Sequence, residues 1–112
     1  MKVTETFFSV VVDDMARATA FYVSAFAATV AYATPTWSSL FIAGVRVGLF
    51  AGERAGHARI GLHFVVDDLA AACREVEAAG GRVAAPAFEA APGVVLAEVE
   101  DTEGNVVILR RG

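Results

Sequence analysis

Apolar and polar residues follow two regular patterns along this chain, and both patterns occur twice. The first copy opens with a β-branched and aromatic run at residues 6–12, which predicts a strand packed on both faces. Behind it, apolar residues recur at spacings of three and four from Met15 to Phe26, the pattern of an amphipathic helix. Three more strands are then predicted, at residues 29–34, 37–42 and 45–50. The first copy is therefore a strand, a helix and three strands.

The second copy repeats this order after a polar, glycine-spaced stretch. A strand is predicted at residues 60–66 and a helix at residues 69–79, which Gly80-Gly81 would end. The remaining strands are predicted at residues 82–87, 94–100 and 106–110. These elements give two βαβββ modules, residues 5–50 and 59–110, joined by a linker at 51–58 within a single domain spanning residues 1–112.

The repeat is visible in the residues that join each first strand to its helix. Val11-Val12-Asp13-Asp14 returns as Val65-Val66-Asp67-Asp68. A carboxylate directly before a helix accepts hydrogen bonds from the backbone N–H groups of the first turn and complements the helix dipole. Both aspartate pairs are therefore interpreted as helix caps rather than as catalytic carboxylates.

Composition and charge narrow the function classes. Of the 112 residues, 56% are hydrophobic, so one core is possible but each module alone would be marginal. The nine Lys and Arg residues are scattered and the formal net charge is −4, which argues against nucleic-acid binding. Without a membrane-length apolar run or a signal-peptide pattern, we expect a cytoplasmic protein with no membrane partner. The lone Cys73 excludes an internal disulfide and is expected to be a small buried apolar residue.

Three groups of residues together resemble the motifs of the vicinal oxygen chelate superfamily, which includes glyoxalase I, extradiol dioxygenases and bleomycin resistance proteins. They are Val12-Asp13-Asp14 with Phe21-Tyr22, Val66-Asp67-Asp68 with Gly80-Gly81, and residues 101–105, where Thr102 stands in place of the usual proline. The resemblance implies an α+β fold in which two βαβββ modules form a cupped mixed β-sheet with helices on the outside. It implies no single activity, because this scaffold carries lyases, oxygenases, isomerases and drug-binding proteins.

The resemblance also locates the positions that hold metal ligands in the metal-dependent members. These positions fall at Phe7, Gly48, Gly61 and Ile108. None of these residues has a side-chain donor, whereas a divalent cation needs several N, O or S ligands. We therefore expect a metal-free, bleomycin-resistance-like member that uses no cofactor.

Residues two apart on a strand share a face, so the strand pattern also predicts a ligand-binding surface around those positions. Leu96 and Glu98 are added to it by resemblance to glyoxalase I. The predicted set is Phe7, Ser9, Trp37, Arg46, Gly48, Phe50, Gly61, His63, Leu96, Glu98, Ile108 and Arg110. This surface is mostly apolar with a few polar groups, which suits a small organic ligand.

Several of these residues have a structural alternative. His63 is either a core histidine or a ligand contact, and Glu98 is either solvent-facing or paired inside the cup. Trp37 is either core packing or a stacking platform, and Arg46 and Arg110 are either surface ion-pair partners or ligand contacts.

The favoured hypothesis is a metal-free protein that binds a small aromatic molecule, such as an antibiotic or a similar natural product, and sequesters it. A second hypothesis is a cofactor-free lyase or isomerase, with His63 and Glu98 as the acid–base pair. A third is a non-catalytic partner module whose cup is filled by side chains. By resemblance, we also expect a homodimer in which each cleft combines the first module of one chain with the second module of the other.

Overall fold

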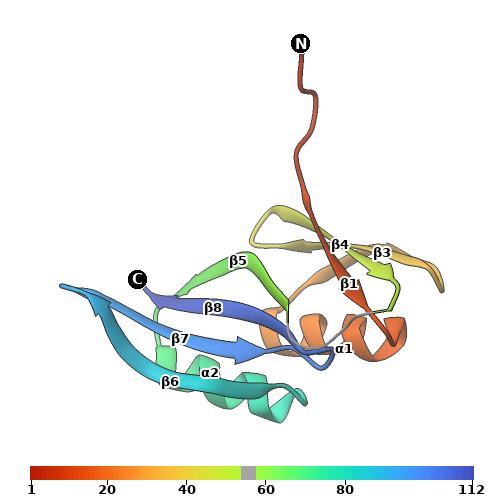
Figure 1. Cartoon of the computed structure of the whole chain (residues 1–112). Coiled ribbons are helices and arrows are strands. Elements are labelled where there is room, and N and C mark those ends of the chain that lie inside the picture. Colours follow the sequence, from red (N-terminus) through yellow and green to blue (C-terminus); the bar gives the residue numbers. More distant parts are fainter. Residues whose placement is uncertain (54–57) are drawn as a thin grey trace. The chain divides into compact units, whose positions relative to one another are not determined.

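The computed structural model describes residues 1–53 and 58–112 of the chain. Two compact units are present, Met1–Arg54 (unit 1) and Ala55–Gly112 (unit 2), and each follows the predicted order of strand, helix and three strands (Figure 1). The α+β fold with two βαβββ modules is therefore confirmed, and each module forms its own four-stranded mixed sheet. Neither helix in the described residues has the length and apolar character needed to cross a bilayer.

Unit 1 consists of one helix against one sheet. Its elements are β1 (Phe8–Val12), α1 (Met15–Phe26), β2 (Thr29–Ala33), β3 (Trp37–Ile42) and β4 (Val45–Ala51). The strand order is β1-β4-β3-β2, with β1 parallel to β4 and the other neighbours antiparallel. The β3–β4 turn has positive φ at both central residues, 49° at Ala43 and 80° at Gly44, as a two-residue hairpin turn requires.

Helix α1 begins where the sequence places its cap. The Asp14 carboxylate accepts a hydrogen bond from the Arg17 N–H at 3.0 Å, so the interpretation of this aspartate as an N-cap is confirmed. The helix packs against β3 and β4 and buries Ala18, Phe21 and Tyr22. The rings of Phe21 and Tyr22 meet edge to face with their centroids 5.2 Å apart. Both rings are buried and form part of the core of unit 1.

Strand β1 differs from its prediction in length and in burial. It begins at Phe8, and only Val10 and Val12 are buried, while Ser9 and Val11 alternate with them and are exposed. The expected packing on both faces is therefore wrong for this strand. The physical reason is that α1 covers one side of the sheet, so the other side of β1 remains open.

Unit 2 repeats this arrangement. Its elements are β5 (Ala58–Val66), α2 (Leu69–Ala78), β6 (Arg82–Ala91), β7 (Val94–Glu100) and β8 (Asn105–Arg111), in the strand order β5-β8-β7-β6. Asp68 caps α2 by accepting from the Ala71 N–H at 2.9 Å. At the other end Gly80, with φ of 99°, allows the Gly81 N–H to reach the Val76 carbonyl, so the predicted glycine stop is confirmed.

Three expectations about element bounds and burial change. The linker is shorter than predicted, because Ala51 pairs with Val12 at the end of β4 and Ala58 opens β5; residues 54–57 lie outside the described residues. Strand β6 continues through Pro86, which an edge strand tolerates because one side of its backbone needs no ladder hydrogen bonds. Cys73 is half-buried rather than buried, and this burial raises the pKa of its thiol.

Candidate functional site

Each sheet has one face that its helix does not cover. In unit 1 the strand register aligns Ser9, Ser39 and Gly48 in one row across β1, β4 and β3, on the side opposite the buried Val10 and Leu49. We call this side of the sheet the unit 1 open face. Its residues are Phe7, Ser9, Trp37, Ser39, Phe41, Arg46, Gly48 and Phe50.

Trp37 lies over Gly48 at the centre of this face. A methyl group added to Gly48 would come closer than 3.0 Å to the Cη2 and Cζ2 atoms of the indole and to 3.1 Å from Cζ3, so only a glycine leaves room for the ring. Gly48 is buried as a result, and Trp37 is half-buried. Trp37 therefore packs on the sheet while keeping part of its ring exposed, which combines the two alternatives considered for it.

Phe7 extends the aromatic surface that Trp37 begins. The two rings meet edge to face, with centroids 6.1 Å apart and an interplanar angle of 81°. Phe7 remains 40% exposed and Phe50, which pairs with Trp37 across β3 and β4, remains 51% exposed. We call Phe7, Trp37 and Phe50 the aromatic platform, and exposed apolar rings that gather on one sheet face are typical of an interaction surface.

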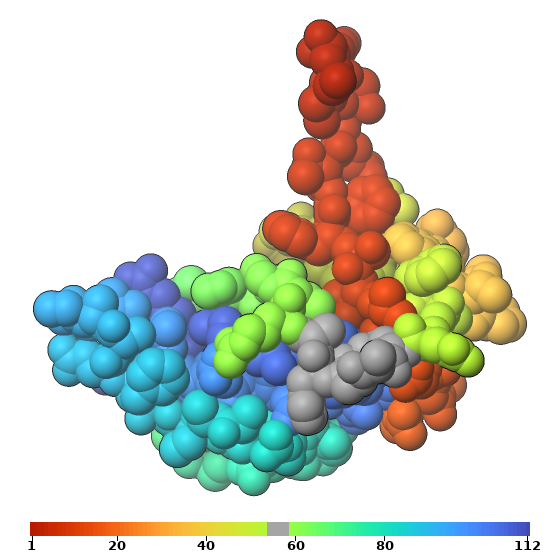
Figure 2. All heavy atoms as spheres, in the orientation of Figure 1, coloured from red at the N-terminus to blue at the C-terminus, as the bar shows by residue number. Residues whose placement is uncertain are grey.

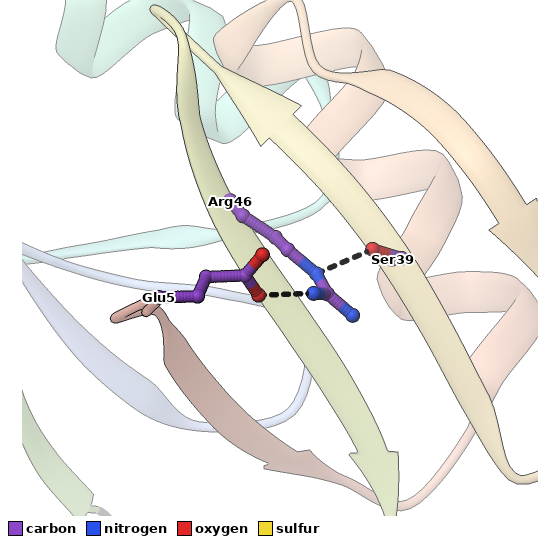
Figure 3. Close-up of polar contacts among 3 residues, drawn as sticks. All are labelled: Glu5, Ser39 and Arg46. Carbon is purple, nitrogen blue, oxygen red and sulfur yellow. Dashed lines mark hydrogen bonds and ion pairs between the residues drawn. The ribbon is translucent and has the colours of Figure 1, made fainter. Parts of the chain in front are cut away.

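Arg46 is held beside this platform by two polar contacts, drawn in Figure 3, and by one contact with an aromatic ring. Its Nε donates a hydrogen bond to the Ser39 Oγ at 3.0 Å, and its Nη1 lies 2.5 Å from a carboxylate oxygen of Glu5. The guanidinium carbon lies 4.3 Å from the centroid of the Phe7 ring, a cation–π distance. Only 25% of the Arg46 side chain is exposed, so the cation is fixed in position.

The unit 2 open face is defined in the same way, as the side of its sheet opposite the buried Ala97, Val99 and Leu109. The register aligns His63, Ile108 and Glu98 in one row and Val65, Arg110 and Leu96 in the next. His63, Val65 and Arg110 are exposed, and Leu96, Glu98 and Ile108 are half-buried. The sequence-predicted residues of unit 2 therefore share one face.

Glu98 is paired on this face, and its partner is Arg59 rather than His63. The Arg59 guanidinium donates to the Glu98 carboxylate, and this hydrogen bond holds the pKa of the carboxyl below its ordinary value. Ile108 stands between Glu98 and His63 in the register, so their backbones are two strand spacings apart, about 9.6 Å. No hydrogen bond joins His63 to Glu98, and the acid–base pair required by the lyase hypothesis is not assembled in unit 2.

The four positions that correspond to metal ligands in the family do not fit a metal. Phe7 and Ile108 present carbon, and the indole of Trp37 occupies the space above Gly48. Gly61 has φ of 71° at a register shift in β5, a backbone conformation in which a ligand-bearing side chain would be strained. Within residues 1–53 and 58–112, no group of three or more His, Cys, Asp or Glu side chains is placed to bind a cation.

Three partners of the predicted residues were missed in the sequence. Ser39 could have been found, because it lies two residues after Trp37 on a strand and so shares its face. Glu5 and Arg59 carry no such signal, because each lies at the start of a unit and pairs with a residue about 40 positions later.

Comparison with protein families identifies the class. The model of the Glyoxalase/Bleomycin resistance protein/Dioxygenase superfamily matches residues 6–109, nearly the whole chain. The chain therefore belongs to this superfamily. No curated protein sequence matches it significantly.

Solved structures extend this result at the level of the fold. The fosfomycin resistance protein FosX from Listeria monocytogenes matches with a TM-score of 0.82 and 18% identity over 100% of this chain and 95% of that chain. A glyoxalase/bleomycin resistance protein/dioxygenase family enzyme from Burkholderia phytofirmans PsJN matches with a TM-score of 0.80 and 20% identity over 93% of this chain and 95% of that chain. A glyoxalase-related enzyme from Fulvimarina pelagi matches with a TM-score of 0.81 and 15% identity over 98% of this chain and 89% of that chain. At these identities the likeness shows the fold alone.

Proposed function

We propose that this protein binds a small, planar, largely apolar molecule on its open faces without a metal ion, and that its role is to sequester that molecule. The observation that carries the proposal is the aromatic platform, in which Trp37 covers Gly48 while Phe7 and Phe50 remain 40% and 51% exposed. Exposed aromatic rings gathered on one sheet face are unfavourable in water, and a planar ligand would remove them from it.

The chemistry of the open faces supports binding over turnover. One structure of the Listeria FosX protein is a complex with Mn(II) and 1S,2S-dihydroxypropylphosphonic acid. In this chain the four positions that the family resemblance assigns to metal ligands carry two glycines, a phenylalanine and an isoleucine, which supply no side-chain donor for a Lewis acid. Glu98 is already engaged by Arg59, which leaves His63 without the partner that a proton-transfer mechanism needs.

The affinity of a planar ligand should come chiefly from the platform. Burial of apolar area contributes about 25 cal/mol per Å², and an aromatic pair adds roughly 0.5–1.5 kcal/mol. A single neutral hydrogen bond contributes about 1 kcal/mol. Removal of one platform ring should therefore weaken binding at least as much as removal of the His63 imidazole.

The test is a titration of planar aromatic compounds, antibiotics included, followed through Trp37, which is the only tryptophan of the chain. A bound planar molecule should change the fluorescence of Trp37 and raise the melting temperature. Phe50→Ala should weaken binding about tenfold, because it removes one exposed ring from the platform.

Phe8→Ala is the matched control for Phe50→Ala. Phe8 is exposed to a similar extent, 48% against 51%, but it pairs with the buried Val47 and so lies on the other side of the sheet. Equal loss of affinity in the two variants would contradict binding on the unit 1 open face. A product formed from any bound compound, lost in His63→Ala, would replace sequestration with catalysis.

We also propose that the working form is a cytoplasmic homodimer in which each cleft combines unit 1 of one chain with unit 2 of the other. Exposed sheet edges support association: all five residues of the edge strand β2 are exposed. A monomeric mass in light scattering at micromolar concentration would contradict this assembly.

A further inference from the structure

Arg46 contacts Glu5 and Ser39 beside the aromatic platform. These contacts bear on the charge of the ligand, which the platform alone does not define. We propose that the Arg46 guanidinium is the recognition group for an oxyanion on the ligand, and that Glu5 occupies this group until the ligand displaces it. The inference rests on the proposed function and narrows the ligand to a class: a planar apolar ring system carrying one carboxylate, phosphonate or similar oxyanion.

Arg46 is positioned as a fixed binding group. Its Nε is held by Ser39 on β3 at 3.0 Å, and its guanidinium plane is supported by the Phe7 ring at 4.3 Å. These contacts come from both sides of β4, and three quarters of the side chain is buried. An arginine held in this way keeps its fork of N–H donors in one orientation, which favours recognition of a planar oxyanion.

Glu5 has the opposite properties. It lies in the N-terminal residues before β1, which belong to no helix or strand and extend as a narrow projection in Figure 2. Its side chain is 57% exposed. Since exposed ion pairs contribute little net free energy, Glu5 can leave Arg46 at small cost and its carboxylate then returns to water.

Charge balance decides which kind of ligand fits. An anionic ligand would replace one carboxylate with another and leave Arg46 paired. A cationic ligand would find no partner in Arg46 and, once it had drawn Glu5 away, would lie close to a guanidinium of the same charge. The net charge of −4 favours cations at long range, but screening over about 8–10 Å makes the local cation the stronger influence at the site.

The location of Arg46 joins this charge to the platform. Arg46 contacts Phe7, and Phe7 contacts Trp37, so the guanidinium and the indole lie at two ends of one continuous surface. A ligand ring on the platform would bring an oxyanion at its edge to Arg46. This juxtaposition is what distinguishes Arg46 from an arginine in a surface ion pair.

The test uses three probes of the same shape: 2-naphthoate, the neutral 2-naphthamide and the cationic 2-naphthamidine. Binding is followed by the single indole N–H resonance, that of Trp37, in the full-length protein. The expected order of affinity is naphthoate, naphthamide, naphthamidine. Glu5→Gln should strengthen naphthoate binding about threefold to fivefold by removing the competing carboxylate, and should leave naphthamide unchanged.

Two further variants complete the design. Arg46→Gln should weaken naphthoate about tenfold or more and should affect naphthamide by less than twofold. Glu75→Gln makes the same charge change on the exposed surface of α2 in unit 2, and it should alter none of the three affinities.

The outcomes separate this inference from the function on which it rests. Normal binding of naphthamide with no preference for naphthoate, or no gain in Glu5→Gln, would overturn the role of Arg46 while leaving a planar-ligand site intact. Absence of any effect of all three probes on Trp37 at millimolar concentration would overturn both. A preference for naphthamidine would assign the site to cations instead.

Discussion

Substitution of Gly48 by alanine tests the packing at the centre of the unit 1 open face. The added methyl group would lie within 3.0 Å of two atoms of the Trp37 ring, and ordinary contact distances are about 3.5–4.0 Å. The indole must therefore move by about 1 Å or rotate away from the sheet. Because it packs against Phe7 as well, that movement also disturbs the platform.

The expected change in stability has two opposing parts. Overpacking costs about 1–3 kcal/mol. Alanine in a strand is favoured over glycine by roughly 0.5–1 kcal/mol. Gly48→Ala should therefore lower the free energy of unfolding by about 0.5–2 kcal/mol, measured by urea denaturation, and should shift the fluorescence of Trp37 to longer wavelength.

A double-mutant cycle identifies the ring as the cause. In the Trp37→Ala background the clash is absent, so Gly48→Ala should become neutral or stabilising, with a coupling energy of about 1–3 kcal/mol between the two positions. Denaturation is then followed by circular dichroism, since the only tryptophan is gone. An equal cost of Gly48→Ala in both backgrounds would refute the assignment of the strain to Trp37.

Three further predictions follow from single contacts. Asp68→Ala should cost about 1 kcal/mol in urea denaturation because it removes the N-cap of α2, and the exposed Asp67→Ala should cost less than about 0.5 kcal/mol; equal costs would contradict the capping assignment. Arg59 lowers the pKa of Glu98, so this pair stabilises the fold above the ordinary carboxyl pKa of about 4.3 and loses that effect as pH falls. The stability difference between Glu98→Gln and the unmodified protein should therefore be largest near pH 7 and decline as the pH falls through the lowered pKa of Glu98, and a pH-independent difference would count against the pair. Elemental analysis should find no stoichiometric Zn, Ni, Mn or Fe, and chelators should not change the melting temperature. About one metal per chain would contradict the proposal that the protein binds its ligand without a metal ion.

The elements that hydrophobic periodicity defines were predictable from the sequence, and the contacts between distant side chains were not. Strands β3 and β7 have the predicted bounds, Trp37–Ile42 and Val94–Glu100. The sequence left open whether Trp37 packs in the core or forms a stacking platform. It carried no information about the direction in which the indole would turn, which depends on the empty space above Gly48 on the neighbouring strand.

Gly61 shows where the sequence held a signal that periodicity missed. A glycine inside a strand pattern indicates a bulge or a close approach, and here β5 shifts register around Gly61 with φ of 71°. Arg59, which pairs with Glu98, lies two residues before Gly61 on the same strand. Gly61 therefore shapes the backbone of β5, in addition to lacking a side chain that could bind a metal.

The internal repeat separates the requirements of folding from those of the site. Positions that cap the helices are the same in both copies, as with Asp14 and Asp68, because each helix needs its first N–H groups satisfied. Positions on the open faces differ: Ser9 in unit 1 corresponds to His63 in unit 2. Since the two sheets share one architecture, the fold does not require this difference between Ser9 and His63. Unit 1 presents aromatic rings with one fixed cation, and unit 2 presents an exposed His63 and, two strands away, a Glu98 carboxylate paired with Arg59. We therefore place the proposed recognition of a planar acid in unit 1, and variants of the exposed residues on its open face are the ones expected to change affinity without unfolding the protein.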